Sequence, residues 1–107
     1  MKTFLCKACR CGGSKGNMGY GLIVSREDQA SHFDRSIKEV LLLIPGFDEA
    51  VKINIDKQSF WGDCRKLIKK EIGVWLRNSG LAPWAKGSPP IVKLVVREPG
   101  VFMIEEV

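Results

Sequence analysis

The feature that most constrains the fold is a strict alternation of apolar and polar side chains over residues 51–56. Val51, Ile53 and Ile55 are apolar, and the residues that follow each of them are polar. Because successive side chains of a strand point to opposite faces, this pattern predicts a strand with one buried face. The apolar run at residues 39–44 ends in a Pro-Gly pair, which is typical of a turn. We therefore expect the two runs to form a hairpin.

Short apolar runs separated by glycine and proline also occur near both ends of the chain. Residues 3–9 and 22–24 predict strands on either side of a segment that holds five glycines. Glycine at that density is typical of a loop with positive φ angles or close backbone approach. Residues 91–96 and 101–107 predict a final hairpin, which follows a rigid, proline-containing connector at residues 83–90.

Two helices are expected among these strands. Ser25 is a suitable N-cap for a helix that ends at about Phe33, and acidic residues fall in its first turn. The later segment allows two interpretations, which are one helix over residues 59–79 or a loop to about residue 69 followed by a shorter helix. The chain is thus predicted to be mainly β (α+β), with about six or seven strands and two helices.

Composition and length suit an ordinary globular chain. The 107 residues fit one domain, and 45% apolar with 27% charged residues argues against disorder. No apolar run approaches the ~20 residues of a membrane span, and the stretch at residues 3–6 is too brief for a signal peptide. We therefore expect a soluble, cytoplasmic protein that has no membrane partner.

The net charge of +5 is unevenly distributed. Residues 1–26 carry five basic residues and no acid, and residues 57–93 carry eight basic residues against two acids. Residues 27–56, in contrast, carry seven acids against three basic residues. If the fold brings the two basic blocks together, they form one positive face, which a phosphate backbone rewards through counterion release. A solvated surface of uneven charge is the alternative.

The four cysteines do not form a recognisable metal site. Cys6, Cys9 and Cys11 are clustered, but a zinc site needs four ligands, so His32 or Cys64 would have to complete it. Small core side chains are the alternative role, and we expect it for Cys9 and Cys11. We expect no zinc, no disulfide and no other cofactor.

Residues 24–33 resemble the corner between a strand and a helix in the plant B3 DNA-binding domains. That family shows a valine or isoleucine, a proline, a basic residue and a short helix that ends in His-Phe. Ser25 replaces the proline here, whereas the other positions match. Further similarity to the family's strands, aromatic pair and second helix lies at Phe4, Lys7 and Ala8, at residues 40–43 and 51–55, at Phe60 and Trp61, and at residues 72–81.

B3 domains fold as a pseudobarrel, and the recognition domains of bacterial restriction endonucleases of the EcoRII and BfiI type have the same fold. Gly13, Gly16 and Gly21 are similar to the glycine-rich loop of the EcoRII-type domain. The resemblance implies an open seven-stranded pseudobarrel with two short helices, formed as a single DNA-binding domain by residues 1–107. It also implies a bacterial recognition domain that works with a nuclease domain or subunit, or a related stand-alone DNA-binding protein.

The same resemblance implies sequence-specific binding of double-stranded DNA by two arms in the major groove. Carried over, the first arm is residues 10–20 and the second is residues 57–66, and both fall within the two basic blocks. The candidate DNA-binding residues are Arg10, Ser14, Lys15, Asn17 and Tyr20 in the first arm, and Lys57, Gln58, Ser59, Trp61, Asp63, Arg65 and Lys66 in the second.

Chemistry gives these residue types different roles. Arginine suits guanine and asparagine suits adenine through bidentate bonds to base edges. Asp63 can accept from a cytosine amino group, although capping a helix is the role we favour. Lys57, Lys69 and Lys70 are expected to contact phosphates, which position a protein without reading sequence. The three tryptophans are expected to pack in the core or the connector, and His32 to end a helix.

A catalytic constellation is not recognisable in the sequence. The chain has one histidine, and it lacks the Glu-x-Lys or Asp-x-Lys tripeptide expected of a metal-dependent nuclease. We therefore expect a binding protein and not an enzyme. Two rival functions stay open, which are a small phage-type inhibitor that binds an acidic protein and a zinc-assisted RNA-binding module.

Overall fold

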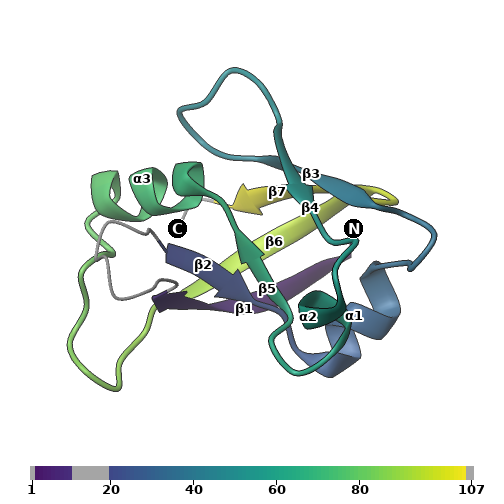
Figure 1. Ribbon diagram of the computed structural model, residues 1–107. Coiled ribbons are helices and arrows are strands. Elements are labelled where there is room, and N and C mark those ends of the chain that lie inside the picture. The colour runs from purple at the N-terminus through teal and green to yellow at the C-terminus, as the bar shows by residue number, and fades with distance from the viewer. Residues whose placement is uncertain (1, 11–19, 106–107) are drawn as a thin grey trace.

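The structure is a computed structural model that describes residues 2–10 and 20–105. Seven strands of these residues form one sheet that curls into a nearly closed barrel, with three short helices toward its ends (Figure 1). The fold is therefore mainly β, as the sequence patterns predict, and forms the open pseudobarrel that the resemblance implies, with one helix more than expected. The elements are β1 (Thr3–Arg10), β2 (Tyr20–Ile23), α1 (Arg26–His32), β3 (Glu39–Leu43), β4 (Val51–Asn54), α2 (Gln58–Trp61), β5 (Lys66–Ile68), α3 (Lys70–Asn78), β6 (Ile91–Glu98) and β7 (Val101–Glu105).

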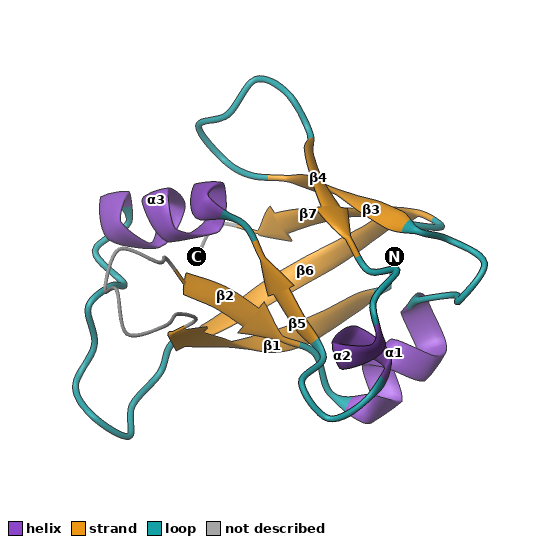
Figure 2. Cartoon of the chain, in the orientation of Figure 1, coloured by secondary structure: helices purple, strands orange, loops and turns teal. Residues whose placement is uncertain are grey.

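The strand order in the sheet is β4-β3-β7-β6-β1-β2-β5. β1 pairs antiparallel with both β2 and β6, and β3 pairs with β7 in parallel. The two strands that end this order, β4 and β5, approach each other and bring the sheet close to closure (Figure 2). β6 and β7, from the end of the chain, thus lie between β1 and β3, from its first half, and join them into one sheet.

The strongest sequence patterns are confirmed. β3 and β4 form the expected antiparallel hairpin, with Val51 and Ile53 buried and Lys52 exposed. The hydroxyl of Ser25 caps α1, since it accepts a hydrogen bond of 3.1 Å from the Asp28 backbone N–H. The final hairpin of β6 and β7 is also present.

The segment after residue 56 differs from the single-helix interpretation, which is wrong. α2 ends at Trp61, the strand β5 follows, and only α3 corresponds to the expected shorter helix. Arg65 interrupts any continuous helix because its φ of 47° lies in the left-handed region, which L-residues other than glycine rarely adopt. Leu67 then pairs with Leu22 of β2. The strand β5 was not predicted from the sequence.

One buried hydrogen bond joins α1 and α2, which lie at the same end of the barrel. Gln29 of α1 is 9% exposed, and its side-chain amide donates to the backbone carbonyl of Phe60 in α2 at 2.6 Å. A buried carbonyl that loses its donor costs the desolvation free energy of the group. Gln29 therefore fixes α2 on α1.

We expect the substitution Gln29→Ala to lower the free energy of unfolding by about 1–3 kcal/mol, because the Phe60 carbonyl would stay buried without a donor. Urea denaturation measures this change. Ser31→Ala, at an exposed position of the same helix, is the matched control and should shift stability by less than about 0.5 kcal/mol. Equal stability of the two variants would contradict the role given to Gln29.

Candidate nucleic-acid interface

The described part of the first arm lies at one end of β1 and β2. Arg10, the last residue of β1, is exposed and stands opposite Tyr20, the first residue of β2. The other first-arm candidates, Ser14, Lys15 and Asn17, lie outside the described residues.

Basic residues from the second half of the chain reach the same end of the sheet. β5 runs antiparallel to β2 with Gly21 opposite Ile68, so the exposed Lys69 and Lys70 follow β5 on the far side of Tyr20 from Arg10. Neighbouring strands are about 4.8 Å apart, so the Cα atoms of Arg10 and Lys69, one on each side of β2, are about 10 Å apart. The fold therefore brings parts of both basic blocks together, as the charge distribution requires for one positive face.

The second arm lies at the opposite end of β2. Lys66 is paired with Ile23, and the Val24 backbone N–H donates to the Arg65 carbonyl at 2.9 Å. Four residues of strand, at about 3.3 Å each, separate the level of Tyr20 from that of Val24, so the arms are about 13 Å apart along β2. This spacing is close to the ~12 Å width of the major groove.

The second-arm candidates gather around α2. Lys57 is the N-cap residue of this helix, and Gln58 and Ser59 are exposed in its first turn. Trp61 is half-buried, and the guanidinium of Arg35 lies 4.9 Å above its ring. Arg35 belongs to the acidic block, and sequence reasoning missed it because no local signal links it to residue 61.

Asp63 pairs with a cation and caps no helix. Its carboxylate accepts from the Arg26 guanidinium at 2.7 Å, and its side chain is 95% exposed. The favoured capping role is wrong, since Ser25, Lys57 and Lys69 occupy the N-cap positions of the three helices in the described chain. An ion pair this exposed contributes little to stability, so the Asp63 carboxylate is held only weakly.

The guanidinium of Arg65 is engaged by the protein itself. Its Nε donates to the Val24 carbonyl at 2.9 Å, and a terminal nitrogen donates to the Gly62 carbonyl at 3.3 Å. These bonds tie the loop after α2 to the end of β2. Arg65 thus positions the second arm.

Two aromatic rings and one cation pack together at the first-arm end. The rings of Tyr20 and Trp84 have centroids 5.1 Å apart, and the Arg77 guanidinium lies 5.4 Å above the Tyr20 ring. Trp84 packs against the core from the connector, as predicted, whereas Trp75 is itself a core residue. The contact with Tyr20 was missed because it joins residues 64 positions apart.

The cysteines are arranged differently from the prediction. Cys6 is the core residue at 1% exposure, and burial raises the pKa of its thiol to about 12. Cys9 is half-buried and not in the core, because inward positions of β1 are Phe4, Cys6 and Ala8. Cys11 lies outside the described residues. Among the residues that are described, no group of three His, Cys, Asp or Glu side chains could hold a metal ion.

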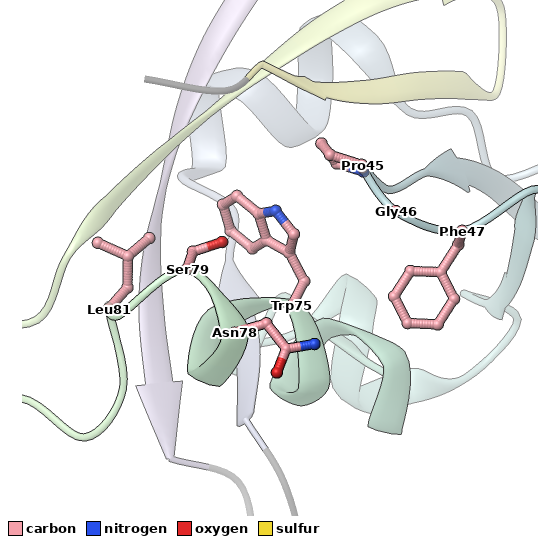
Figure 3. A pocket seen from close by; sticks show the side chains of 7 residues that line it. All are labelled: Pro45, Gly46, Phe47, Trp75, Asn78, Ser79 and Leu81. Atoms are coloured by element: carbon pink, nitrogen blue, oxygen red, sulfur yellow. The ribbon is translucent and has the colours of Figure 1, made fainter.

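A separate hollow of about 520 Å³ lies between α3 and the β3–β4 turn (Figure 3). In Figure 3 the indole of Trp75 stands in its middle, with Phe47 on one side and Leu81 on the other. Its lining residues are Pro45, Gly46, Phe47, Trp75, Asn78, Ser79 and Leu81, and none of them is ionisable near neutral pH. This hollow therefore offers no acid–base group, and no predicted site residue lines it.

Comparisons with protein-family models, with curated proteins and with solved structures gave no match. The resemblance to B3 domains accordingly stays a prediction. None of the described helices is both long enough and apolar enough to span a membrane.

We expect the substitution Arg65→Ala to lower the free energy of unfolding by about 1–3 kcal/mol, because two backbone carbonyls would lose a charged donor. Lys66→Ala, in the same arm, is the control and should change stability by less than about 0.5 kcal/mol. Guanidinium denaturation compares the two variants. If Arg65→Ala is as stable as the parent, its guanidinium does not hold the loop.

We expect Cys6 to resist alkylation in the folded protein at pH 8, because its thiol is buried and stays protonated well below about pH 12. Cys64 is exposed and should react readily under the same conditions. Peptide mapping by mass spectrometry, before and after unfolding, reports each site separately. If Cys6 is labelled as fast as Cys64 in the folded protein, the prediction is wrong and β1 opens at this position.

Proposed function

We propose that this chain binds double-stranded DNA and has a binding function rather than a catalytic one. The observation that supports this most is a set of exposed cations around Tyr20, which we call the basic side. These cations come from the end of β1, the start and end of α3 and the connector before β6. They are Arg10, Lys69, Lys70, Arg77 and Lys86.

The placement of two lysines argues for contact with an anion. Lys69 is the N-cap of α3 and Lys70 its first residue, and the Lys69 ammonium has no acceptor with which to cap the helix. The positive end of a helix dipole disfavours lysine at both positions. These residues therefore do not serve the stability of α3. With the helix N-terminus they supply more positive charge than Glu71, the one acid of the first turn, offsets, and this charge suits phosphate.

Acidic residues bound the basic side on one flank. Asp48 and Glu49, from the β3–β4 turn, line a hollow that Lys69 and Glu71 also line. Lys69 thus lies at the border, whereas Arg10 lies beside β2, opposite Tyr20. We expect DNA to approach over β2 and to avoid the β3–β4 turn.

Base reading is assigned to the arms at the two ends of β2. Arg10 is the described first-arm residue whose guanidinium suits a guanine edge, and Gln58 with Ser59 is exposed in the second arm. The spacing of about 13 Å along β2 lets both arms enter one major groove. The further proposal, a recognition domain of a restriction endonuclease with a nuclease partner, rests on the B3-like resemblance alone.

We expect Lys70→Ala to weaken binding to all duplexes alike and to reduce the slope of log affinity against log salt by about one, because one phosphate contact is lost. Arg10→Ala should instead cost about 1–3 kcal/mol and relax the preference at one base pair. Fluorescence anisotropy with selected and random duplexes, over a salt series, measures both effects.

Arg97→Ala is the matched control, since it removes one exposed positive charge at the β6–β7 turn, at the other end of β1 from Arg10. It should leave the salt slope unchanged, and Glu49→Gln should increase affinity slightly. The proposal fails if the parent does not bind duplex DNA at low salt. It also fails if Arg97→Ala and Lys70→Ala have equal effects.

A further inference from the structure

A second hollow, of about 530 Å³, lies beside Arg10 and is called here the Trp84 hollow. It opens between the end of β1 and the connector that leads from α3 to β6. Its lining residues are Ala8, Cys9 and Arg10 on the strand, and Trp84, Lys86, Gly87 and Pro89 on the connector. Its volume lies within the ~300–1,000 Å³ of small-molecule sites.

The two walls of the Trp84 hollow are fixed to each other. The Ala8 backbone N–H donates to the Pro90 carbonyl at 2.9 Å, which fastens the connector to β1. The connector itself turns tightly, since the Ser88 N–H donates to the Ala85 carbonyl at 3.0 Å. Gly87 has a φ of +84° in this turn, a conformation that favours glycine. The hollow is therefore held open by the backbone.

Trp84 is a supported aromatic platform in this hollow. Its ring packs at 5.1 Å and 50° on Tyr20, which in turn carries the Arg77 guanidinium. The half-buried indole is thus held in place from the β2 side and still lines the hollow. An aromatic ring fixed in this way suits stacking on another flat ring.

Two cations flank the platform. Arg10 and Lys86 both line the hollow and are exposed, and neither has an ion-pair partner within residues 2–10 and 20–105. A flat aromatic surface with two unneutralised cations is complementary to a flat ring that carries a phosphate. A nucleotide has this chemistry, with a π face on its base and a charge on its backbone.

We propose that the Trp84 hollow accepts one unpaired base of bound DNA. The base stacks on Trp84 and Lys86 contacts the adjoining phosphate, whereas Arg10, at the rim of the hollow, keeps its role at the edge of a neighbouring paired base. This proposal rests on the proposed function, since the hollow adjoins the basic side and shares Arg10 and Lys86 with it. A base in a normal pair stays in the helix because extrusion costs unstacking and unpairing, a cost that is least for a mismatched or unpaired base. The chain is therefore a sensor of bases that have left the duplex.

The experiment compares three duplexes of one sequence, which are fully paired, with a single bulged base, and with an abasic site at the bulge. The abasic bulge distorts the DNA similarly but has no base to stack. We expect the parent protein to bind the bulged base about tenfold more tightly than either of the other duplexes. Anisotropy competition at fixed salt gives these ratios.

Variants at the hollow separate stacking from charge. Trp84→Ala should abolish the tenfold preference and leave affinity for the paired duplex within about twofold, whereas Trp84→Phe should keep most of the preference. Lys86→Ala, on an exposed turn, should weaken binding to all duplexes and, in addition, reduce the preference for the bulged base about threefold, whereas Arg97→Ala should not change the preference. Circular dichroism melting confirms that each variant is folded, and Lys86→Ala tests the hollow if Trp84→Ala does not fold.

The outcomes distinguish this proposal from the proposed function. If paired DNA binds but the bulged base gives no advantage over the abasic bulge, the base-accepting hollow is wrong and duplex binding stands. If Trp84→Ala folds and keeps the preference, or Lys86→Ala has no effect on it, the hollow is also wrong. If no duplex binds at low salt, both proposals fail.

Discussion

Contact among four phenylalanines closes one end of the barrel, and the rest of the structure depends on it. Phe33 lies 4.9 Å from Phe102 and 5.1 Å from Phe60, and Phe4 lies 5.5 Å from Phe102, between ring centroids. These rings come from β1, the end of α1, α2 and β7, so one cluster joins segments from the whole length of the described chain. His32 stacks on Phe4 at 4.7 Å and extends the cluster to the surface. Because α1 and α2 are anchored here, the loop that carries the second arm has a fixed base.

The strands with clear alternation and the cap at Ser25 could be predicted because their signals are local. β5 could not, since it has three residues and its flanking apolar positions imitate a helical spacing. Lys57 and Lys69 gave no sign of a helix start, because they are poor N-cap residues. The burial of Cys6 rather than Cys9 depends on which face of β1 is inward, and the residues of β1 do not reveal that because apolar side chains fall on both of its faces.

The sequence predicts which segments of the candidate site are basic, but it does not predict which of their residues lie side by side. The two basic blocks are visible in the sequence, but the β2–β5 pairing that brings Lys69 and Lys70 beside Tyr20 is a tertiary event. The same holds for Tyr20 and Trp84, and for Arg35 above Trp61. Arg65 shows the opposite case, because a residue chosen for its charge has its guanidinium bonded to backbone carbonyls. Charge alone cannot separate a ligand contact from a structural one.

The central place of β1 in the sheet has a consequence for how the chain acquires its fold. β1 precedes every other described strand in the sequence, yet one of its two partners is β6, with Thr3 opposite Val95. β3 likewise cannot complete its pairing until β7 is present, with Leu41 opposite Val101. Pairings of such long sequence separation must close large loops before they are rewarded, so we expect slow folding that completes only after synthesis of the final hairpin. Until then β1 has an open edge, and nascent chains are exposed to pairing with one another.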